Sequence, residues 1–129
     1  MIWEDEASVA FAPFASRSPF EVWVVPRRHA ADFATATDSD LASTAEALRQ
    51  VLGRLAWLDG PPHNLVLHAA PLRERVDATY HWHWEIHPRL REIAGLEIGT
   101  GLPVNPVSPE EAVEELMRHR PDGGAEETR

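Results

Sequence analysis

The chain has 129 residues, is 43% hydrophobic and carries a formal net charge of −9 at pH 7. This is the length of one ordinary domain, and the acidic excess argues against a nucleic-acid partner, because duplex binding needs a dense basic face. The sequence contains no cysteine. Disulfides and thiolate metal sites are therefore excluded, and any metal must be held by His, Asp or Glu.

The first eleven residues, MIWEDEASVAF, lack the basic start and the long apolar run of a signal peptide. No stretch approaches the roughly 18 consecutive apolar residues of a membrane span. We therefore expect a cytoplasmic protein without a membrane partner.

The first half of the chain predicts two strands and a long helix. Residues 8–15 read as a strand that runs into a loop, and residues 20–26 as a β-branched and aromatic strand ended by a proline. A helix is predicted over 39–58, with Thr37 or Asp38 as its N-cap. Its apolar positions follow one helical face, formed by Leu41, Ala45, Leu48, Leu52 and Leu55.

The second half predicts three more strands and a final helix. Residues 64–71 read as a buried strand, 79–88 as an alternating strand and 95–107 as a bent or bulged strand. The last helix starts in SPEEAVEELMRH, with Ser108 as N-cap, Pro109 at the first helical position and Glu111 completing a capping box. Together these elements predict one α+β domain over residues 1–120, an antiparallel β-sheet with one long helix packed on it and a C-terminal helix. The last nine residues, 121–129, are predicted to be a flexible tail.

The stretch HWHWEIHPR, residues 81–89, contains the strongest functional signal. Strand geometry places alternate residues on one face, with neighbours about 7 Å apart. We expect the tryptophans between them, like those at 3, 23 and 57, to belong to the core. The polar row consists of His81, His83, Glu85 and His87.

Such a row favours a site over a solvated surface and is consistent with two chemistries. Imidazoles and a carboxylate ligate a divalent metal, whereas a single imidazole held by its neighbours acts as a nucleophile. His68 joins the row if its strand pairs with 79–88. Two further candidates are the pair Arg27 and Arg28, whose donors at a strand end suit a phosphate, and Glu97, which lies among glycines.

The order of these motifs resembles that of the histidine-triad (HIT-like) superfamily. The stretches PFEVWVVPRRH, HAAP, HWHWEIHPRL and SPEEAVEEL are similar to the C-terminal half of the galactose-1-phosphate uridylyltransferases. The run AGLEIGTGLPVNPV resembles the branch of that family that contains ADP-glucose phosphorylases. The resemblance implies a HIT-like fold and a nucleotidyltransferase that binds a nucleotide sugar or a hexose 1-phosphate.

The family transfers a nucleoside monophosphate through a nucleotidyl-histidine in a His-Pro-His-x-Gln motif of its N-terminal half. This sequence lacks that motif. The resemblance thus leaves open half of a split or truncated enzyme, with a separate N-terminal half as partner, and a single HIT-like domain with its own task. It also implies pairing into a homodimer.

By motif position, the resemblance implies that His68, His83 and Glu85 ligate zinc or iron, with His81 as a substitute for a glutamate of the other half. It further implies that Glu97 binds hexose hydroxyls, while Arg27 and Arg28 neutralise phosphate. Two alternatives stay open. One is a free-standing hydrolase or transferase in which His83 is the nucleophile, and the other is a non-catalytic nucleotide- or sugar-binding module.

Overall fold

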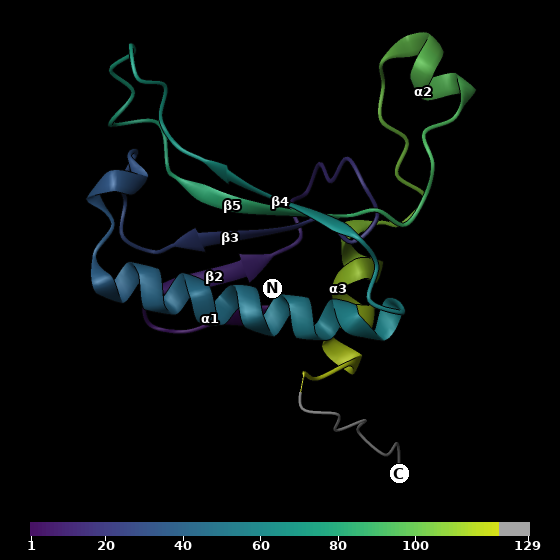
Figure 1. Ribbon diagram of the computed structural model, residues 1–129, viewed down its shortest axis with the longest axis horizontal. Helices are drawn as coiled ribbons and strands as arrows, with labels where there is room; N and C mark the ends of the chain where they lie inside the picture. The colour runs from purple at the N-terminus through teal and green to yellow at the C-terminus, as the bar shows by residue number, and fades with distance from the viewer. Residues whose placement is uncertain (122–129) are drawn as a thin grey trace.

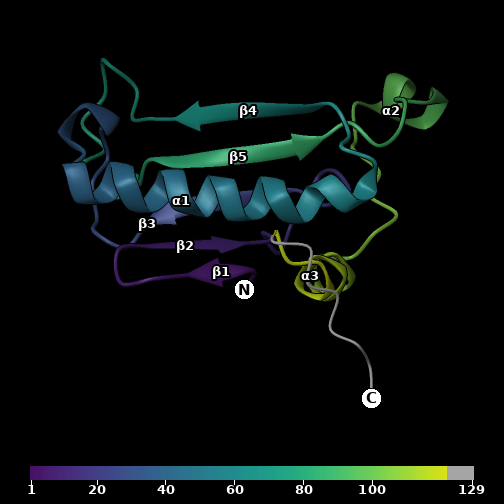
Figure 2. The same ribbon diagram turned by 60° about the horizontal axis from the view of Figure 1, so that its bottom comes forward.

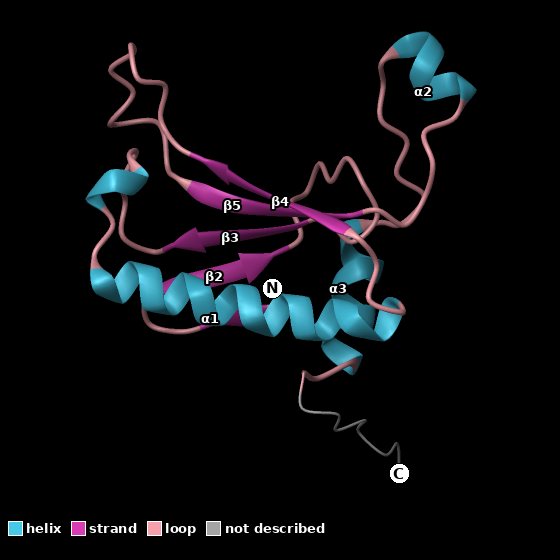
Figure 3. Cartoon of the chain, in the orientation of Figure 1, coloured by secondary structure: helices cyan, strands magenta, loops and turns pink. Residues whose placement is uncertain are grey.

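Five short strands form one antiparallel sheet in the order β1-β2-β3-β5-β4 (Figure 1). The computed structural model describes residues 1–121. The predicted α+β fold, with an antiparallel sheet and one long helix, is confirmed (Figure 3). The strands are β1 (Trp3–Glu4), β2 (Ser8–Phe11), β3 (Val22–Pro26), β4 (His63–His68) and β5 (His83–Pro88).

Helix α1 (Asp38–Leu55) lies across one face of this sheet (Figure 2). It begins where predicted. The Thr37 hydroxyl accepts a hydrogen bond from the Asp40 amide, and the Asp40 carboxylate accepts one from the Thr37 amide. A 3₁₀ turn, η2 (Ala56–Leu58), continues the helix, and a shorter one, η1 (Phe33–Thr35), precedes it.

The face that α1 turns to the sheet differs from the predicted face. Leu41 and Ala45 are exposed, whereas Leu48 and Leu52 are partly buried at the margin of the contact. The fully buried stripe is smaller and more polar, consisting of Asp40, Ser43, Thr44, Ala47, Val51, Arg54 and Leu55. Small side chains in this stripe bring the helix backbone close to the sheet, so the flanking leucines cover the edges of the core rather than its centre.

The core lies between α1 and the sheet. Strands β3 and β5 alternate, so that Val22, Val24 and Ile86 face the helix and are fully buried. Helix α3 (Pro109–Arg118) packs against α1 and closes one end of the core with Ala112 and Leu116. Its predicted start is confirmed, since Ser108 and Glu111 form the capping box ahead of the helix.

Two strand predictions require correction. The segment predicted as a buried strand, 64–71, is the edge strand β4 (His63–His68). Leu65, opposite Ile86, faces the α1 side of the sheet but stays exposed at its edge, and Val66, opposite Glu85, is exposed on the other face. The alternating strand predicted over 79–88 begins only at His83. Residues 79–82 belong to the connection from β4, so the strand is shorter than the alternating sequence predicted.

The glycine-rich segment 95–107 is not a strand. It contains a six-residue helix, α2 (Gly95–Thr100), on a loop that projects from the end of the sheet (Figures 1 and 3). The Glu97 carboxylate accepts a hydrogen bond from the Ala94 amide at 3.1 Å and so caps the helix start. Gly101 ends it with a φ of 71°, a left-handed conformation that favours glycine.

The tail predicted for residues 121–129 lies, from residue 122 onward, outside the described residues. No helix within residues 1–121 has both the length and the apolar character that crossing a bilayer requires.

Candidate functional site

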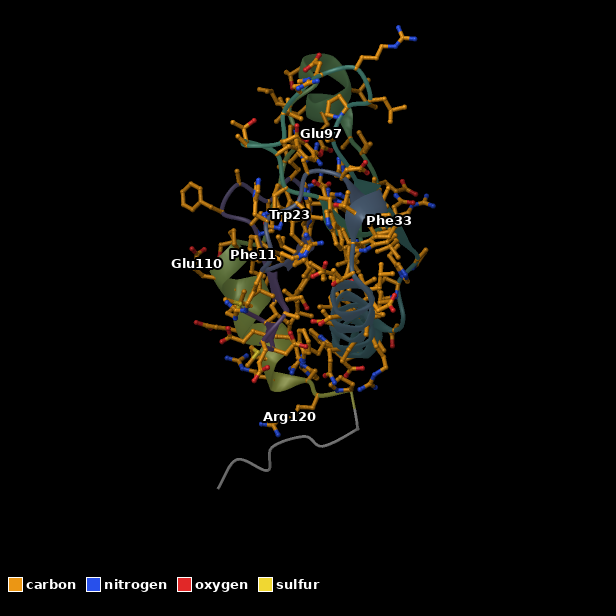
Figure 4. All side chains as sticks on the ribbon, turned by 90° about the vertical axis from the view of Figure 1, so that its left-hand side faces the viewer. Phe11, Trp23, Phe33, Glu97, Glu110 and Arg120 are labelled. Carbon is orange, nitrogen blue, oxygen red and sulfur yellow. The ribbon has the colours of Figure 1, made fainter. Side chains whose placement is uncertain are left out.

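The face of the sheet opposite α1 carries the histidine row. On β5, Trp84 and Ile86 turn toward the core, so His83, Glu85 and His87 project from the other side. Figure 4 views the molecule from one end and shows Trp23 on the side of the sheet away from α1, with Phe33 on the α1 side. We call this surface the open face.

Antiparallel pairing brings the neighbouring strands into the same site. His68 on β4 lies directly opposite His83 on β5, and Trp23 on β3 lies opposite Glu85. Directly opposed residues share a face, so both side chains join the row. The predicted pairing of the His68 strand with the histidine strand is therefore present.

The Glu85 carboxylate is the centre of the cluster. Its Oε1 lies 3.3 Å from Nε2 of His83, and its Oε2 lies 3.3 Å from Nε2 of His68. The Nε2–H of His87 donates to Oε2 at 2.8 Å. Three imidazoles thus converge on one carboxylate.

The His83 ring is fixed in orientation. Its Nδ1–H donates to the backbone carbonyl of His81 at 2.9 Å, which turns Nε2 toward the cluster. The ring is stacked on Trp23, with centroids 4.5 Å apart, and on His68, with centroids 5.1 Å apart. A ring held on both faces points Nε2 in one direction, as both metal binding and nucleophilic attack require.

Glu85 is charged despite being only 4% exposed. Burial alone would raise its pKa. The hydrogen bond from His87, the charge on His68 and the hydrogen bond from His83 outweigh that effect, and the pKa of Glu85 lies below its ordinary value. The site therefore offers an ionised carboxylate beside imidazole nitrogens.

His81 does not reach this cluster. Its Nε2–H donates to the Pro26 carbonyl at 2.7 Å, and its ring meets the edge of His29. Burial lowers the pKa of His81, and the nearby charges of His29, His83 and Arg28 lower it further. Since β5 begins after it, His81 leaves the row and contributes its backbone carbonyl to His83 instead.

The two arginines at the end of β3 are held by carboxylates elsewhere. Arg27 pairs with Glu4 on β1, at the sheet edge opposite β4, and donates to the Asp5 carbonyl. Arg28 donates through Nε and one NH₂ group to Asp40, at the start of α1. The structure brings neither guanidinium to the histidine cluster.

Glu97 is also engaged within its own loop. Besides the Ala94 amide, its carboxylate accepts the Val104 amide at 3.1 Å and pairs with Arg91. These backbone hydrogen bonds, together with Arg91, hold the pKa of Glu97 below its ordinary value. Glu97 nevertheless lines an open pocket of about 780 Å³ between the α2 loop and the end of β5.

That pocket adjoins the histidine cluster through His87. Its basic lining residues are Arg17, Arg89 and Arg91. Asn105 donates to the carbonyls of Ser16 and Ser18 and so ties the α2 loop to the β2–β3 connection at this point. The pocket is therefore continuous with the open face and rich in guanidinium groups.

Sequence reasoning missed Glu21 and Arg17 on the open face and assigned a third residue there, Trp23, to the core. Glu21 is 1% exposed and accepts hydrogen bonds from the Arg17 amide at 2.6 Å and from the Trp23 indole at 2.9 Å. The Arg17 guanidinium reaches Glu85 at 3.2 Å. The available signal was a lone glutamate next to the apolar run VWVVP, because a charge in a buried strand requires a partner.

The nitrogen and oxygen donors of His68, His83 and Glu85 lie within 4.8 Å of one another. Two imidazoles and a carboxylate are a donor set that suits zinc or ferrous iron, and the ionised state of Glu85 suits it too. On chemical grounds these three residues fit a divalent cation.

No family model matches the chain. Among individual proteins, it is 38% identical over 119 residues to an ADP-glucose phosphorylase from Arabidopsis thaliana, covering 88% of this chain and 34% of the relative. It is 31% identical over 124 residues to a galactose-1-phosphate uridylyltransferase from Thermotoga maritima, covering 89% of this chain and 39% of the relative. The chain thus spans little more than a third of the length of these relatives.

Solved structures show the same similarity. The crystal structure of an ADP-glucose phosphorylase from Arabidopsis thaliana with bound ADP-glucose matches with a TM-score of 0.84 at 35% identity, over 90% of this chain and 39% of that one. A zinc-bound histidine triad family protein from Mycobacterium smegmatis matches with a TM-score of 0.64 at 19% identity, over 90% of this chain and 79% of that one, a likeness of fold alone. The chain has the HIT-like fold and is homologous to the C-terminal region of the galactose-1-phosphate uridylyltransferase and ADP-glucose phosphorylase family.

Proposed function

We propose that this chain is a cation-holding HIT-like domain of a nucleotidyltransferase and that it binds a nucleotide sugar or a hexose 1-phosphate. One observation carries the proposal: two imidazoles and an ionised, buried carboxylate converge on the open face, beside a pocket lined by arginines. Homology to enzymes that act on hexose phosphates supports this assignment.

In this proposal His68, His83 and Glu85 hold zinc or iron. A bound divalent cation would neutralise Glu85 and cross-link β4 to β5. Around it, the indole of Trp23 and the His81 carbonyl keep the His83 ring in place, since one stacks on the ring and the other accepts its Nδ1–H. These contacts give the open face a fixed shape for a ligand.

The anionic part of the ligand would be bound in the pocket. Arg17 and Arg89 line it with exposed side chains, and guanidinium groups bind phosphate through paired hydrogen bonds. Arg27 and Arg28 are less suited to this role, because they do not line the pocket and are paired with Glu4 and Asp40. Glu97 lines the same pocket and would accept hydrogen bonds from sugar hydroxyls.

We propose further that the domain pairs with a second copy and acts with an N-terminal half that carries the nucleotidyl-histidine. The α2 loop supports pairing, because it projects from the domain and exposes several large apolar side chains, namely Ile93, Leu96, Ile98 and Leu102. Light scattering at micromolar concentration should give twice the monomer mass. The monomer mass would rule out the homodimer.

Ligand binding can be measured by isothermal titration of the zinc-loaded protein with ADP-glucose, UDP-glucose and glucose 1-phosphate. We expect saturable binding of at least one of them. Arg89→Ala should weaken it by about tenfold if a phosphate contact is lost, a change of about 1.4 kcal/mol. The control is Arg49→Ala, on the exposed side of α1. The absence of binding by all three ligands would refute the proposal.

A second function is favoured by the geometry of His83. With Nδ1–H bonded to the His81 carbonyl, Nε2 is the nitrogen that would attack an α-phosphorus, forming a P–N bond while hexose 1-phosphate leaves. Glu85 opposes this, because its Oε1 lies 3.3 Å from that nitrogen and would repel the phosphate. Mass spectrometry after incubation with ADP-glucose separates the two functions. A nucleoside monophosphate adduct that disappears in His83→Ala would establish the nucleophile, and an unchanged mass would exclude it.

A further inference from the structure

A second group of ligand atoms lies on the open face beside the first, formed by Glu21, Glu85 and His87. We propose that these three residues form a second divalent-cation position and that Glu85, shared with His68 and His83, bridges the two positions. The inference extends the cation site proposed above but uses two residues, Glu21 and His87, that take no part in it.

The geometry of the second group is close to that of a bound ion. One ligand atom from each residue lies within 4.8 Å of the other two. The His87 ring approaches the two carboxylates through different nitrogens: Nε2 is 2.8 Å from Oε2 of Glu85 and Nδ1 is 4.0 Å from Oε2 of Glu21, so an ion would take one of the two nitrogens. Ligands of a tetrahedral ion at about 2.1 Å lie about 3.4 Å apart, so the separations within the group would have to shorten by at most about 1.4 Å to complete the site.

Burial and charge favour a cation here. Glu21 and Glu85 are 1% and 4% exposed, and two carboxylates removed from water need compensating charge. The hydrogen bonds to Glu21 come from two neutral donors, the Arg17 amide and the Trp23 indole. The Arg17 guanidinium lies on Glu85, but its side chain is 61% exposed, so it can give up this place to an ion.

The position is also open to solvent on one side. His87 and Arg17 line the pocket of about 780 Å³, whereas Glu21 and Glu85 lie beneath it. An ion would enter through the pocket, meet the His87 ring first and displace the Arg17 guanidinium from Glu85. One imidazole and two carboxylates suit Zn²⁺, Fe²⁺ or Mn²⁺.

Zinc stoichiometry tests the proposal. Metal-free protein is dialysed against Zn²⁺, and bound metal is measured by atomic emission. We expect two ions per chain in the wild type, one in Glu21→Gln, one in His87→Gln and one in His68→Ala, which retains the second position. Glu85→Gln should lose both. Because Glu21 is buried, its variant is checked by circular dichroism, and the less buried His87 tests the same position independently.

The two cation positions can fail separately. One ion in the wild type that survives in Glu21→Gln and His87→Gln but is lost in His68→Ala overturns the second position and leaves the first. One ion that survives in His68→Ala but is lost in the other two variants overturns the first. No bound ion overturns both. His63→Ala is the control for surface binding, since His63 is an exposed histidine on the same strand as His68.

Arg17 supplies a second measurement. If its guanidinium competes with the ion for Glu85, Arg17→Met should bind the second zinc about tenfold more tightly, while the Arg17 amide keeps its bond to Glu21. Unchanged or weaker affinity in this variant would contradict the displacement of Arg17.

Discussion

The two faces of the sheet have opposite properties although they are built from the same strands. Toward α1, the side chains of Val22, Val24 and Ile86 are apolar and fully buried. On the open face, the alternate residues of the same strands form a polar cluster, in which Trp23 stacks on His83 and His87 donates a hydrogen bond to Glu85. The covered face is closed by a helix, whereas the open face adjoins a pocket.

Neighbouring residues of one strand therefore have different roles: one contributes to the stability of the core and the next to the candidate site. Alternate residues of a strand point to opposite faces, so a polar row can be built without opening the core. We therefore expect substitutions on the covered face to cost stability whether or not metal is present. Substitutions on the open face should change stability mainly by weakening the binding of a metal ion or ligand there.

The largest effect is expected from Ile86→Ala. Ile86 is fully buried between β5 and α1, and truncation leaves a cavity, so the free energy of unfolding should fall by about 3 kcal/mol. The matched control is Leu65→Ala, on the directly opposed residue of β4, which is 42% exposed and should cost about 1 kcal/mol. Urea unfolding measures both. Equal losses of unfolding free energy in the two variants would mean that α1 does not bury Ile86 more effectively than Leu65.

Zinc should stabilise the protein through the open face. At a free concentration of one hundred times Kd, a ligand bound only to the folded state adds about 2.7 kcal/mol to the free energy of unfolding. We expect this gain in the wild type, and a smaller gain in His68→Ala, which loses one of the two proposed positions. Thermal unfolding with and without zinc measures it. An equal gain in both proteins would place the stabilising ion away from His68.

Arg28→Ala should cost about 2 kcal/mol, since it leaves the buried Asp40 carboxylate without its guanidinium partner at the start of α1. The adjacent Arg27 pairs with Glu4 in an exposed ion pair, so Arg27→Ala should cost less than about 1 kcal/mol. Urea unfolding of the two variants compares neighbours that differ chiefly in the burial of the partner. A larger loss of stability in Arg27→Ala than in Arg28→Ala would refute the stronger contribution of the Arg28–Asp40 pair.

Acid should weaken the attachment of α1 through Asp40. Burial raises the pKa of Asp40, but the hydrogen bonds from Arg28 and Thr37 outweigh it and leave the pKa below its ordinary value of 3.8. A folded pKa below the unfolded one means that the stabilisation is complete above about pH 4 and is lost as pH falls through the folded value. Unfolding measured from about pH 5 to about pH 3 should show a steeper loss in the wild type than in Asp40→Asn. The exposed Asp38→Asn is the control, and parallel curves for the wild type and Asp40→Asn would contradict the prediction.

Much of the fold was predictable from the sequence, because its strand alternation and its helix-capping residues agree with the observed elements. The alternation around His83 predicted a strand with two unlike faces, and the caps at Thr37 and Ser108 predicted the starts of both long helices. The inward face of α1 was not predictable from the leucines. Its buried polar residues depend on tertiary partners, as Asp40 does on Arg28, and on local bonds such as that from the Thr44 hydroxyl to the Asp40 carbonyl.

The site was predictable only in part. His68 was expected beside the row, and strand pairing brings it there. His81 was expected to belong to the row, but the strand starts two residues later. Glu21 was missed because its burial depends on how β3 lies against β5. Around Glu97, glycines and β-formers indicated a strand, whereas the capping bond from Ala94 and the left-handed Gly101 produce a short helix.

We propose above that His68, His83 and Glu85 together bind one divalent cation. The most direct measurement is anomalous X-ray scattering at the zinc absorption edge, from crystals grown with zinc. We predict an anomalous peak about 2.0–2.2 Å from Nε2 of His68, Nε2 of His83 and a carboxylate oxygen of Glu85. Zinc-containing crystals with no peak between these three side chains would show that they do not form a cation site.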